Sequence, residues 1–581
     1  CGKAWLFSMK KAIPVLIAVV LILIIGGVAF GGQAIERYTY SHEQADLYEY
    51  FHITKESDVP IILQNEVTGQ DAVLKDGICY LEYRDVQDIL NSRFYIDKNE
   101  GLLLYTTPTE IIRASLDASS YTVNGVENPV DYCIFYAVEG NEETKYYIAL
   151  DYVKKYTNFS YEVFPDPSRV QIYTSWEEEQ AADIKSDTDV RLRGGVKSPI
   201  LCHVKEGDRV VVLDKMETWS QVKTADGFVG YVENKKLTNE RTETPTPVTD
   251  YAEPEYTTLK QDKKICLGWH GVYSTTGNGT LNDVTANASG LTVIAPTWFS
   301  VSDTNGSLRS FAEASYVEKA HEKGLQVWGV VDDFNYLDDQ GNRTDVAAVL
   351  ASTTTRTALI DNIMNAAAAC GMDGVNVDFE KVMDEAAGED FVEFLRELSI
   401  RCRQAGLVFS VDDSVPYHFN TRYNLAEQGV IADYVIIMAY DEHWAGSEEA
   451  GSVSSIDYVR YAIEKTGEYV PGDKIVVALP FYTRLWITEG TSLTSEAYPM
   501  TGVDALLQKY NMTYDWDDTT GQNYAEATDG TTLYQMWIED LQSFNVKLTV
   551  MQNYELGGVA AWRLGFEPVG AWDLIRVYLE R

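Results

Sequence analysis

Residues 373–380 read Asp373-Gly-Val-Asn-Val-Asp-Phe-Glu380, and polar and apolar side chains alternate along this stretch. Because successive side chains of a β-strand point to opposite faces, Asn376, Asp378 and Glu380 share one face, and the three apolar residues between and before them share the other. The apolar face can pack against helices. A buried carboxylate is costly in folding free energy unless it is paired or has a function. The stretch therefore predicts a buried strand whose polar face lines a functional site.

Seven further apolar runs accompany this strand in the second half of the chain. They alternate with segments of helical periodicity, such as residues 391–398. Eight such units in about 320 residues predict an α/β fold, a (β/α)₈ TIM barrel over residues 260–581, with its active site at the C-terminal ends of the strands. We expect an insertion at 487–535 over that face. The eight strands are expected at 265–269, 291–295, 325–331, 375–379, 407–411, 434–438, 475–479 and 558–562.

An apolar stretch without charge lies near the start, at residues 12–32. At 1.5 Å per residue it would span roughly 30 Å, the thickness of the hydrocarbon core of a bilayer. Lys3, Lys10 and Lys11 precede it, which favours an N-terminus inside the cell. Residues 1–35 are therefore expected to be a cytoplasmic stub and a transmembrane signal anchor. The C-terminal domains would lie outside the cell, and the protein would be secreted if the segment is cleaved.

Residues 40–175 contain an internal repeat. The segment from Cys79–Val86 to Leu104–Thr107 aligns with the segment from Tyr146–Val153 to Gln171–Thr174, and each copy predicts a strand, a helical turn and two further strands. We expect a duplicated α+β domain. It resembles the duplicated module at the N-terminus of copper amine oxidases, which implies a stalk and no copper chemistry.

Residues 186–238 predict a small all-β barrel, because short alternating strands are separated by Gly and Asp turns. The pattern resembles bacterial Src-homology-3-like (SH3-like) domains, which implies either binding to cell-wall peptides or a spacer without ligand. Residues 239–259 are rich in Thr, Pro and Glu and predict an extended linker.

The composition excludes several functions. The chain has 88 acidic and 47 basic residues and a formal net charge of -41, so we expect no nucleic-acid partner, because such proteins displace phosphate counterions with Lys and Arg. The seven cysteines are scattered without a Cys-x-x-Cys pair, and the seven histidines form no cluster. We therefore expect no metal and no cofactor.

Asp378 and Glu380 carry the predicted chemistry. Residues two apart on a strand are separated by roughly 6.5–7 Å, so an ionised Asp378 disfavours ionisation of Glu380 and helps it to act as a general acid. A polar strand end that only faces solvent is the alternative interpretation. Four polar residues at this spacing on a barrel strand favour the catalytic interpretation.

The stretch resembles the signature of glycoside hydrolase family 18, Asp-Gly-x-Asp-x-Asp-x-Glu on the fourth strand. Met438-Ala-Tyr-Asp441, Pro480–Trp486 and Trp562 match the family on strands six, seven and eight. His443–Ser447 and Trp537–Asp540 resemble the branch of spore-cortex and cell-wall N-acetylglucosaminidases. Asn376 replaces the middle Asp of the signature, as is common in that branch.

The resemblance implies a retaining, substrate-assisted hydrolase that cleaves β-1,4 bonds after N-acetylglucosamine. Glu380 would be the acid and later the base, Asp378 would hydrogen-bond the acetamido N–H, and Tyr440 would contact the acetamido oxygen. Residues expected to bind substrate are Asp373, Asn376, Asp441, Trp562, Tyr482, Trp298 and Trp444. With neutral Asn376 beside it, Asp378 would lack an acidic partner and would stay ionised over a wider pH range.

The resemblance leaves three substrates or roles open. Peptidoglycan is the polysaccharide expected from the cell-wall branch, and chitin is the alternative within the same chemistry. A non-catalytic protein that binds cell-wall carbohydrate is the alternative from another class. Retention of the acid Glu380 argues against it, because binding alone would not require that side chain.

Overall fold

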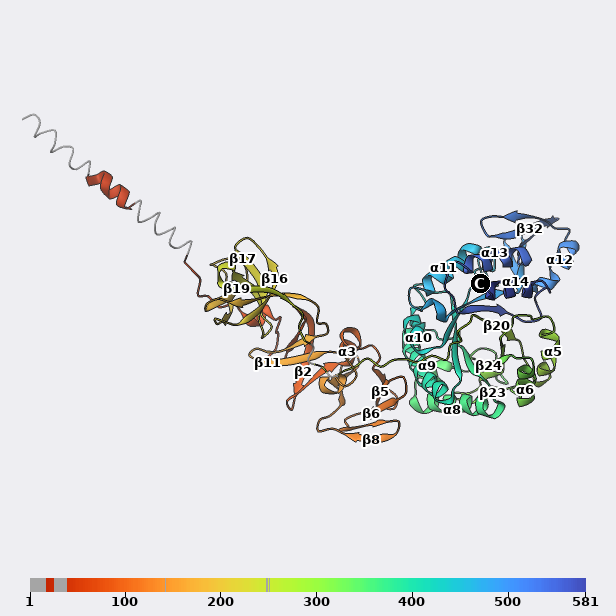
Figure 1. The fold of residues 1–581 in the computed structure, drawn as a ribbon, viewed down its shortest axis with the longest axis horizontal. Coiled ribbons are helices and arrows are strands. Elements are labelled where there is room, and N and C mark those ends of the chain that lie inside the picture. Colours follow the sequence, from red (N-terminus) through yellow and green to blue (C-terminus); the bar gives the residue numbers. More distant parts are fainter. Residues whose placement is uncertain (1–16, 26–38, 142, 247–248, 250, 581) are drawn as a thin grey trace, which may run out of the picture. The chain divides into compact units, whose positions relative to one another are not determined.

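The computed structural model describes residues 17–25, 39–141, 143–246, 249 and 251–580. By its internal contacts the chain divides into two units. The first contains Cys1–Ser92 and Val130–Glu253, and the second contains Arg93–Pro129 and Pro254–Arg581. Figure 1 shows the elements of both units, which are treated separately below.

The predicted transmembrane segment, 12–32, falls mostly outside the described residues. Its described part, residues 17–25, is helical. Across the described part of the chain, no helix has both the length and the apolar character that crossing a membrane requires. A membrane anchor at the N-terminus therefore stays a prediction.

The first unit begins with a seven-stranded sheet, in the order β11-β12-β1-β2-β3-β10-β9. Both copies of the sequence repeat follow the element order that the repeat predicts. In the first copy, β3 (Ile78–Glu82) and α3 (Tyr83–Ile89) precede β4 (Tyr95–Asp97) and β5 (Leu102–Thr106). In the second, β10 (Thr144–Ala149) and α4 (Leu150–Val153) precede two strands of the same sheet. The remaining strands of this sheet are β1 (Val59–Leu63), β2 (Glu66–Lys75), β9 (Phe135–Glu139), β11 (Ser160–Pro165) and β12 (Ser168–Tyr173).

A second seven-stranded sheet completes the first unit, in the order β15-β14-β18-β17-β16-β13-β19. Its core contains Val190, Val210, Val222 and Val232, and it contains the predicted small β domain, 186–238. The predicted linker begins later than expected, because residues up to Glu243 pair with Glu179 at the sheet edge. The strands are β13 (Glu179–Ile184), β14 (Thr188–Arg191), β15 (Ile200–Val204), β16 (Arg209–Lys215), β17 (Trp219–Lys223), β18 (Val229–Glu233) and β19 (Leu237–Glu243).

The second unit is built on a closed barrel of eight parallel strands. Each strand pairs with the next, and the eighth pairs with the first at Cys266↔Val559, so no edge is left open. The eight strands lie where the sequence predicts them. They are β20 (Ile265–His270), β21 (Val293–Pro296), β24 (Gln326–Asp332), β25 (Gly374–Asp378), β26 (Val408–Ser414), β27 (Tyr434–Met438), β28 (Ile475–Pro480) and β34 (Gly558–Trp562).

Helices surround this barrel and cover the apolar face of β25, as the alternation of residues 373–380 predicts. Val375, Val377 and Phe379 belong to the core between strands and helices. The ring of Phe379 stacks on that of Phe394 in α9 (Glu385–Ala405), with centroids 5.5 Å apart. The other longer helices are α6 (Ala314–Glu322), α8 (Thr353–Cys370), α11 (Ile456–Thr466), α13 (Leu541–Met551) and α14 (Ala571–Leu579).

The predicted insertion is a five-stranded antiparallel sheet, in the order β30-β29-β33-β32-β31. It begins at Tyr482 and ends at Ile538, slightly beyond the predicted bounds of 487–535 on both sides. Leu485, Ala525 and Met536 form part of its own small core. The strands are β29 (Tyr482–Glu489), β30 (Ser492–Pro499), β31 (Thr513–Asp517), β32 (Gln522–Asp529) and β33 (Thr532–Ile538), with α12 (Val503–Lys509) between β30 and β31.

A second accessory sheet of the barrel unit comes from the middle of the predicted stalk. Strands β4 to β8, within residues 93–129, form a five-stranded sheet that contacts α8 and α9. Asp97 Oδ2 accepts a hydrogen bond of 2.5 Å from the backbone N–H of Thr353, the first residue of α8. The remaining strands are β6 (Ile111–Ser115), β7 (Ser120–Val123) and β8 (Val126–Pro129).

Buried charges join this sheet to the helices. Arg356 of α8 and Glu397 of α9 form an ion pair of 3.1 Å in which both side chains are buried, and Arg113 contacts Glu397 at 2.8 Å. Tyr95 donates a hydrogen bond of 2.6 Å to Asp390. A buried ion pair is strongly destabilised when one partner is removed. Residues 93–129 are therefore part of the folded barrel unit.

Candidate active site

A cavity of 190 Å³ lies at the C-terminal ends of the barrel strands. It brings together six of the residues predicted from the sequence, which come from β25, β27, β29 and β34 or from the residues that directly follow them. The cavity is lined by Trp269, Tyr273, Phe334, Asn335, Asp378, Glu380, Asp412, Met438, Tyr440, Asp441, Tyr482 and Trp562.

Asn376 lies two residues before Asp378 on β25, and its side chain forms hydrogen bonds with residues of other barrel strands at the base of the cavity. The indole N–H of Trp269 donates to Asn376 Oδ1 at 3.2 Å. The Asn376 amide donates to Asp412 Oδ1 at 2.7 Å and to Ser410 Oγ at 3.0 Å, both on β26. Asn376 is fully buried, so it acts through its neighbours and does not reach a bound substrate.

Asp378 and Asp412 form the electrostatic centre of the cavity. Both are buried, and Asp378 Oδ1 and Asp412 Oδ2 have no hydrogen-bond partner among the described residues. Burial raises the pKa of Asp378 well above its usual value, and the nearby charge of Asp412 raises it further. The expectation that Asp378 lacks an acidic partner was wrong. The sequence places Asn at the signature position, but the neighbouring strand supplies the carboxylate.

Glu380 lies two residues beyond the end of β25, and its side chain is 38% exposed. Asp333, which follows β24, fixes the backbone at this point. Asp333 Oδ1 accepts from the N–H of Glu380 at 3.0 Å, and Oδ2 accepts from the N–H of Lys381 at 2.8 Å. Burial raises the pKa of Asp333 to about 6. The side chain of Glu380 is therefore accessible while its backbone is held.

Tyr440, Asp441 and Tyr482 form one wall of the cavity. The Tyr482 hydroxyl donates a hydrogen bond of 2.6 Å to Asp441 Oδ1, and the Tyr440 and Tyr482 rings meet edge to face. Asp441 has a φ of +56°, a backbone conformation that non-glycine residues seldom adopt. Burial raises the pKa of Tyr440 well above its usual value, so its hydroxyl stays a hydrogen-bond donor.

Trp562 ends β34 and contributes an aromatic face to the cavity. Its ring lies 5.8 Å from that of Trp269, at an angle of 59°. Trp269 is buried among the side chains that fill the barrel, whereas Trp562 is only partly buried. This placement agrees with the predicted platform for a sugar ring, which stays a prediction.

Three predicted binding residues lie away from the cavity. Asp373 precedes β25, accepts from the N–H of Val327 at 2.8 Å and contacts His321, so it joins strands at the opposite end of the barrel. Trp298 is fully buried, packs in the outer core and donates to Asn278. Trp444 is 57% exposed and does not line the cavity. Their positions give them structural or surface roles in the unliganded protein.

Asp333 and Asp412 are the functional residues that sequence reasoning missed. A signal for both exists in the sequence. Asp332-Asp333 and Asp412-Asp413 stand at the C-terminal ends of the third and fifth predicted strands, where barrel active sites lie.

Within the described residues, no group of three or more His, Cys, Asp or Glu side chains could hold a metal ion. The six cysteines in that part of the chain are free thiols.

Comparison with characterised sequences finds relatives over part of the chain. YdhD of Bacillus subtilis (strain 168), whose name describes a sporulation-specific glycosylase, is 31% identical over 42% of this chain and 60% of its own length. The cortical fragment-lytic enzyme of Bacillus anthracis is 26% identical over 39% of this chain and 55% of its own. The chain thus spans less than two thirds of the length of these two relatives.

Among solved structures, the spore cortex-lytic enzyme SleL of Bacillus cereus matches with a TM-score of 0.49 and 23% identity. The match covers 55% of this chain and 75% of that one.

Comparison with known families gives two matches. Residues 186–238 match the bacterial SH3 domain, in agreement with the small barrel of the first unit. Residues 229–567, more than half of the 581-residue chain, match glycosyl hydrolases family 18. With the eight-stranded barrel and the carboxylates at the end of its fourth strand, the chain belongs to glycosyl hydrolases family 18.

Proposed function

We propose that this protein is a retaining, substrate-assisted glycosidase that cleaves β-1,4 bonds after N-acetylglucosamine in peptidoglycan. The observation that carries the proposal is the position of Glu380 at the strand end, accessible and beside the buried Asp378 in one cavity. A carbohydrate-binding protein would not require an accessible carboxylic acid beside a buried one.

Glu380 protonates the glycosidic oxygen in the first step. The 2-acetamido carbonyl oxygen of the substrate attacks the anomeric carbon as the bond to the leaving sugar breaks, and an oxazolinium ion forms. Water then attacks the anomeric carbon and breaks its bond to the acetamido oxygen, while Glu380 takes the proton of the water. Two inversions at the same carbon leave the configuration retained. Tyr440 donates a hydrogen bond to the acetamido oxygen, and Asp441, oriented by Tyr482, contacts the same sugar.

Asp378 accepts the acetamido N–H and stabilises the positive charge that develops on the oxazolinium ion. Its Oδ1, which has no partner among the described residues, is available as that acceptor. Asp412 shares a proton with Asp378. Like charges in one buried site disfavour simultaneous ionisation, so the two carboxyl groups carry one proton between them, which lies on Asp412 when Asp378 is ionised and stabilises the cationic intermediate.

Two observations that concern the cell wall support peptidoglycan as the substrate. Relatives include enzymes named for lysis of spore cortical fragments, and the first unit contains a bacterial SH3 domain, for which we propose binding to the cell wall. Chitin is the second candidate, because a relative from Caenorhabditis elegans is named as a probable endochitinase.

We also propose that the protein acts outside the cell, at the cell membrane or as a secreted form. The apolar stretch 12–32 and the lysines before it support this placement. Fractionation of cells that express the full chain tests it. The protein is expected in the membrane fraction or the medium, and recovery in the cytosol alone would contradict it.

Replacement of Glu380 tests the proposed function. The full chain, incubated with purified peptidoglycan and separately with chitin oligomers, is expected to release reducing ends of N-acetylglucosamine, identified by mass spectrometry after borohydride reduction. Glu380→Gln removes the acid without changing shape and is expected to lower the rate by 10²-fold or more. Glu449→Gln, at an exposed position of the same unit, is the matched control and should retain the wild-type rate.

Three results would contradict the proposal in whole or in part. Equal release by the wild type and Glu380→Gln would show that Glu380 is not the acid. Binding to peptidoglycan without release from either substrate would favour a non-catalytic wall-binding protein. Release from chitin oligomers alone would replace peptidoglycan by chitin as the substrate.

A further inference from the structure

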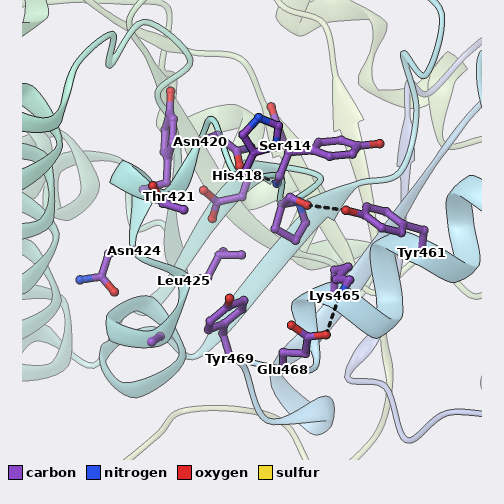
Figure 2. A pocket seen from close by; sticks show the side chains of 15 residues that line it. Ser414, His418, Asn420, Thr421, Asn424, Leu425, Tyr461, Lys465, Glu468 and Tyr469 are labelled. Atoms are coloured by element: carbon purple, nitrogen blue, oxygen red, sulfur yellow. Dashed lines mark hydrogen bonds and ion pairs between the residues drawn. The ribbon is translucent and has the colours of Figure 1, made fainter.

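A second cavity, of 440 Å³, lies on the other face of strand β26 from the active site (Figure 2). Asp412 and Asp413 are neighbours on this strand, so their side chains point to opposite faces. Asp412 lines the active site, and Asp413 lines the second cavity. We call this cavity the tyrosine pocket. Its walls include Tyr417, Tyr423, Leu425, Tyr461 and Tyr469.

The tyrosine pocket contains a hydrogen-bond acceptor that lacks a donor. Asp413, which lines the pocket, is 3% exposed, and its Oδ1 accepts from the Gln428 amide at 3.2 Å. Asp413 Oδ2 has no partner among the described residues. A buried acceptor without a donor costs folding free energy. This atom therefore favours a ligand that brings a donor.

The walls of the pocket suit a cationic group on an apolar chain. Tyr461 and Tyr469 contribute aromatic rings to its walls, and the faces of tyrosine rings attract cations. Leu425 offers apolar surface to an alkyl chain. Lys465, whose charge would oppose a cation, is paired with Glu468 at 2.7 Å. Figure 2 shows this pair and the ring of Tyr469 along one side of the pocket.

We propose that the tyrosine pocket binds a primary ammonium group on a short alkyl chain, with Asp413 Oδ2 as its acceptor. An ammonium group has three donors and no acceptor, which matches the unpartnered Asp413 Oδ2. A sugar hydroxyl also brings acceptor lone pairs, which a carboxylate oxygen cannot satisfy.

The proposal rests on the proposed function and narrows its substrate. The peptide branches of peptidoglycan contain diamino acids with such an ammonium group, whereas chitin has no peptide. The pocket and the active site lie on the two faces of one strand, and they share no lining residue.

Binding of this ligand would change the protonation of Asp413. Burial raises the pKa of Asp413 to about 7. A bound ammonium group would favour the ionised carboxylate and lower this pKa, because opposite charges in close contact stabilise each other.

Calorimetric titration of the full-length protein with Nα-acetyl-lysine methylamide tests the proposal. The probe is expected to bind, and acetylation of its side-chain amine, which removes the charge, should weaken binding at least tenfold. Asp413→Asn should weaken binding of the amine at least tenfold. Asp457→Asn, an exposed position on α11, is the matched control and should bind as the wild type does.

Two results would overturn the proposal: no binding of the amine to the wild type, or equal affinities for the amine and its acetylated form. If Asp413→Asn melts at a lower temperature than the wild type, Tyr469→Leu replaces it, because Tyr469 is 52% exposed and its loss should spare the fold. Tyr469→Leu should weaken binding several-fold, and unchanged affinity in that variant would also count against the pocket.

Probe binding does not depend on hydrolysis. The titration is repeated with Glu380→Gln, which should bind the probe as the wild type does. Hydrolysis of peptidoglycan without probe binding would overturn the pocket alone, and probe binding without hydrolysis would overturn the proposed function alone.

Discussion

Asp378 and Asp412 show how one buried cavity holds two carboxyl groups from neighbouring strands. Asn376, on the same strand as Asp378, donates to Asp412 on the neighbouring strand at 2.7 Å, which fixes that carboxylate. An Asp at position 376 would instead place a third acid in the same site. Neutral Asn376 is therefore compatible with Asp412, and the acidic partner expected within the signature stands one strand away.

Replacement of Asp412 tests this arrangement through the pH dependence of hydrolysis. Asp378 must be ionised to stabilise the intermediate, so its pKa sets the acid limb of kcat/KM. The charge of Asp412 raises that pKa. Asp412→Asn removes the charge, lowers the pKa of Asp378 and should move the acid limb to lower pH, by on the order of one unit.

Asp457→Asn serves as the control for this profile and should keep the wild-type limb. An acid limb of Asp412→Asn that stays in place, or moves to higher pH, would show that Asp412 does not govern ionisation of Asp378.

At the scale of elements, the start of helix α8 depends on the sheet of strands β4 to β8. Ser352, at the N-cap, makes no capping hydrogen bond with its side chain. Asp97 instead accepts from the N–H and the hydroxyl of Thr353, and Glu100 accepts from the N–H of Thr354 at 2.7 Å. The free N–H groups at a helix start require such partners.

Removal of Asp97 tests this capping contact. Asp97→Ala leaves the first N–H of α8 without its acceptor and should lower the free energy of unfolding of the barrel unit by about 1–2 kcal/mol. Urea titration followed by tryptophan fluorescence measures it. Lys98→Ala, at the exposed neighbouring position, is the control. Equal midpoints for the two variants would contradict a stabilising contact between the sheet and α8.

The strands of the barrel were predictable because their periodicity is local. Alternation placed Val375, Val377 and Phe379 toward the helices and Asn376 and Asp378 inward, and the structure agrees. The role of the fifth strand was not predicted from the sequence. Asp412 and Asp413 are adjacent acids in the sequence, and only the closed barrel shows that one enters the active site and the other a second cavity.

At the scale of the whole molecule, the repeat could not reveal to which unit its strands belong. Both copies have the same element order, yet β4 and β5 belong to the sheet that packs on the barrel, whereas β11 and β12 belong to the first unit. The difference depends on contacts such as Tyr95 with Asp390, almost 300 residues apart in the chain. Sequence periodicity contains no information on such partners.

The predicted placement of Trp298 at a subsite was wrong for a related reason. Trp298 and Trp562 both stand near strand ends, but Trp298 turns outward into the core and Trp562 turns inward to the cavity. The side to which a strand-end side chain turns depends on the register of the closed barrel. The family motifs indicated which side chains face the cavity at strands four and six. No motif indicated this at strand two.

The central claim is that the cavity performs substrate-assisted hydrolysis with retention. Proton NMR of N-acetylglucosamine oligomers, or of reduced peptidoglycan strands, followed within the first minutes after addition of the full chain, tests it most directly. The account predicts that the β-anomer of the new reducing end appears first and then mutarotates. Initial appearance of the α-anomer would contradict it, because inversion requires direct attack by water and no acetamido intermediate.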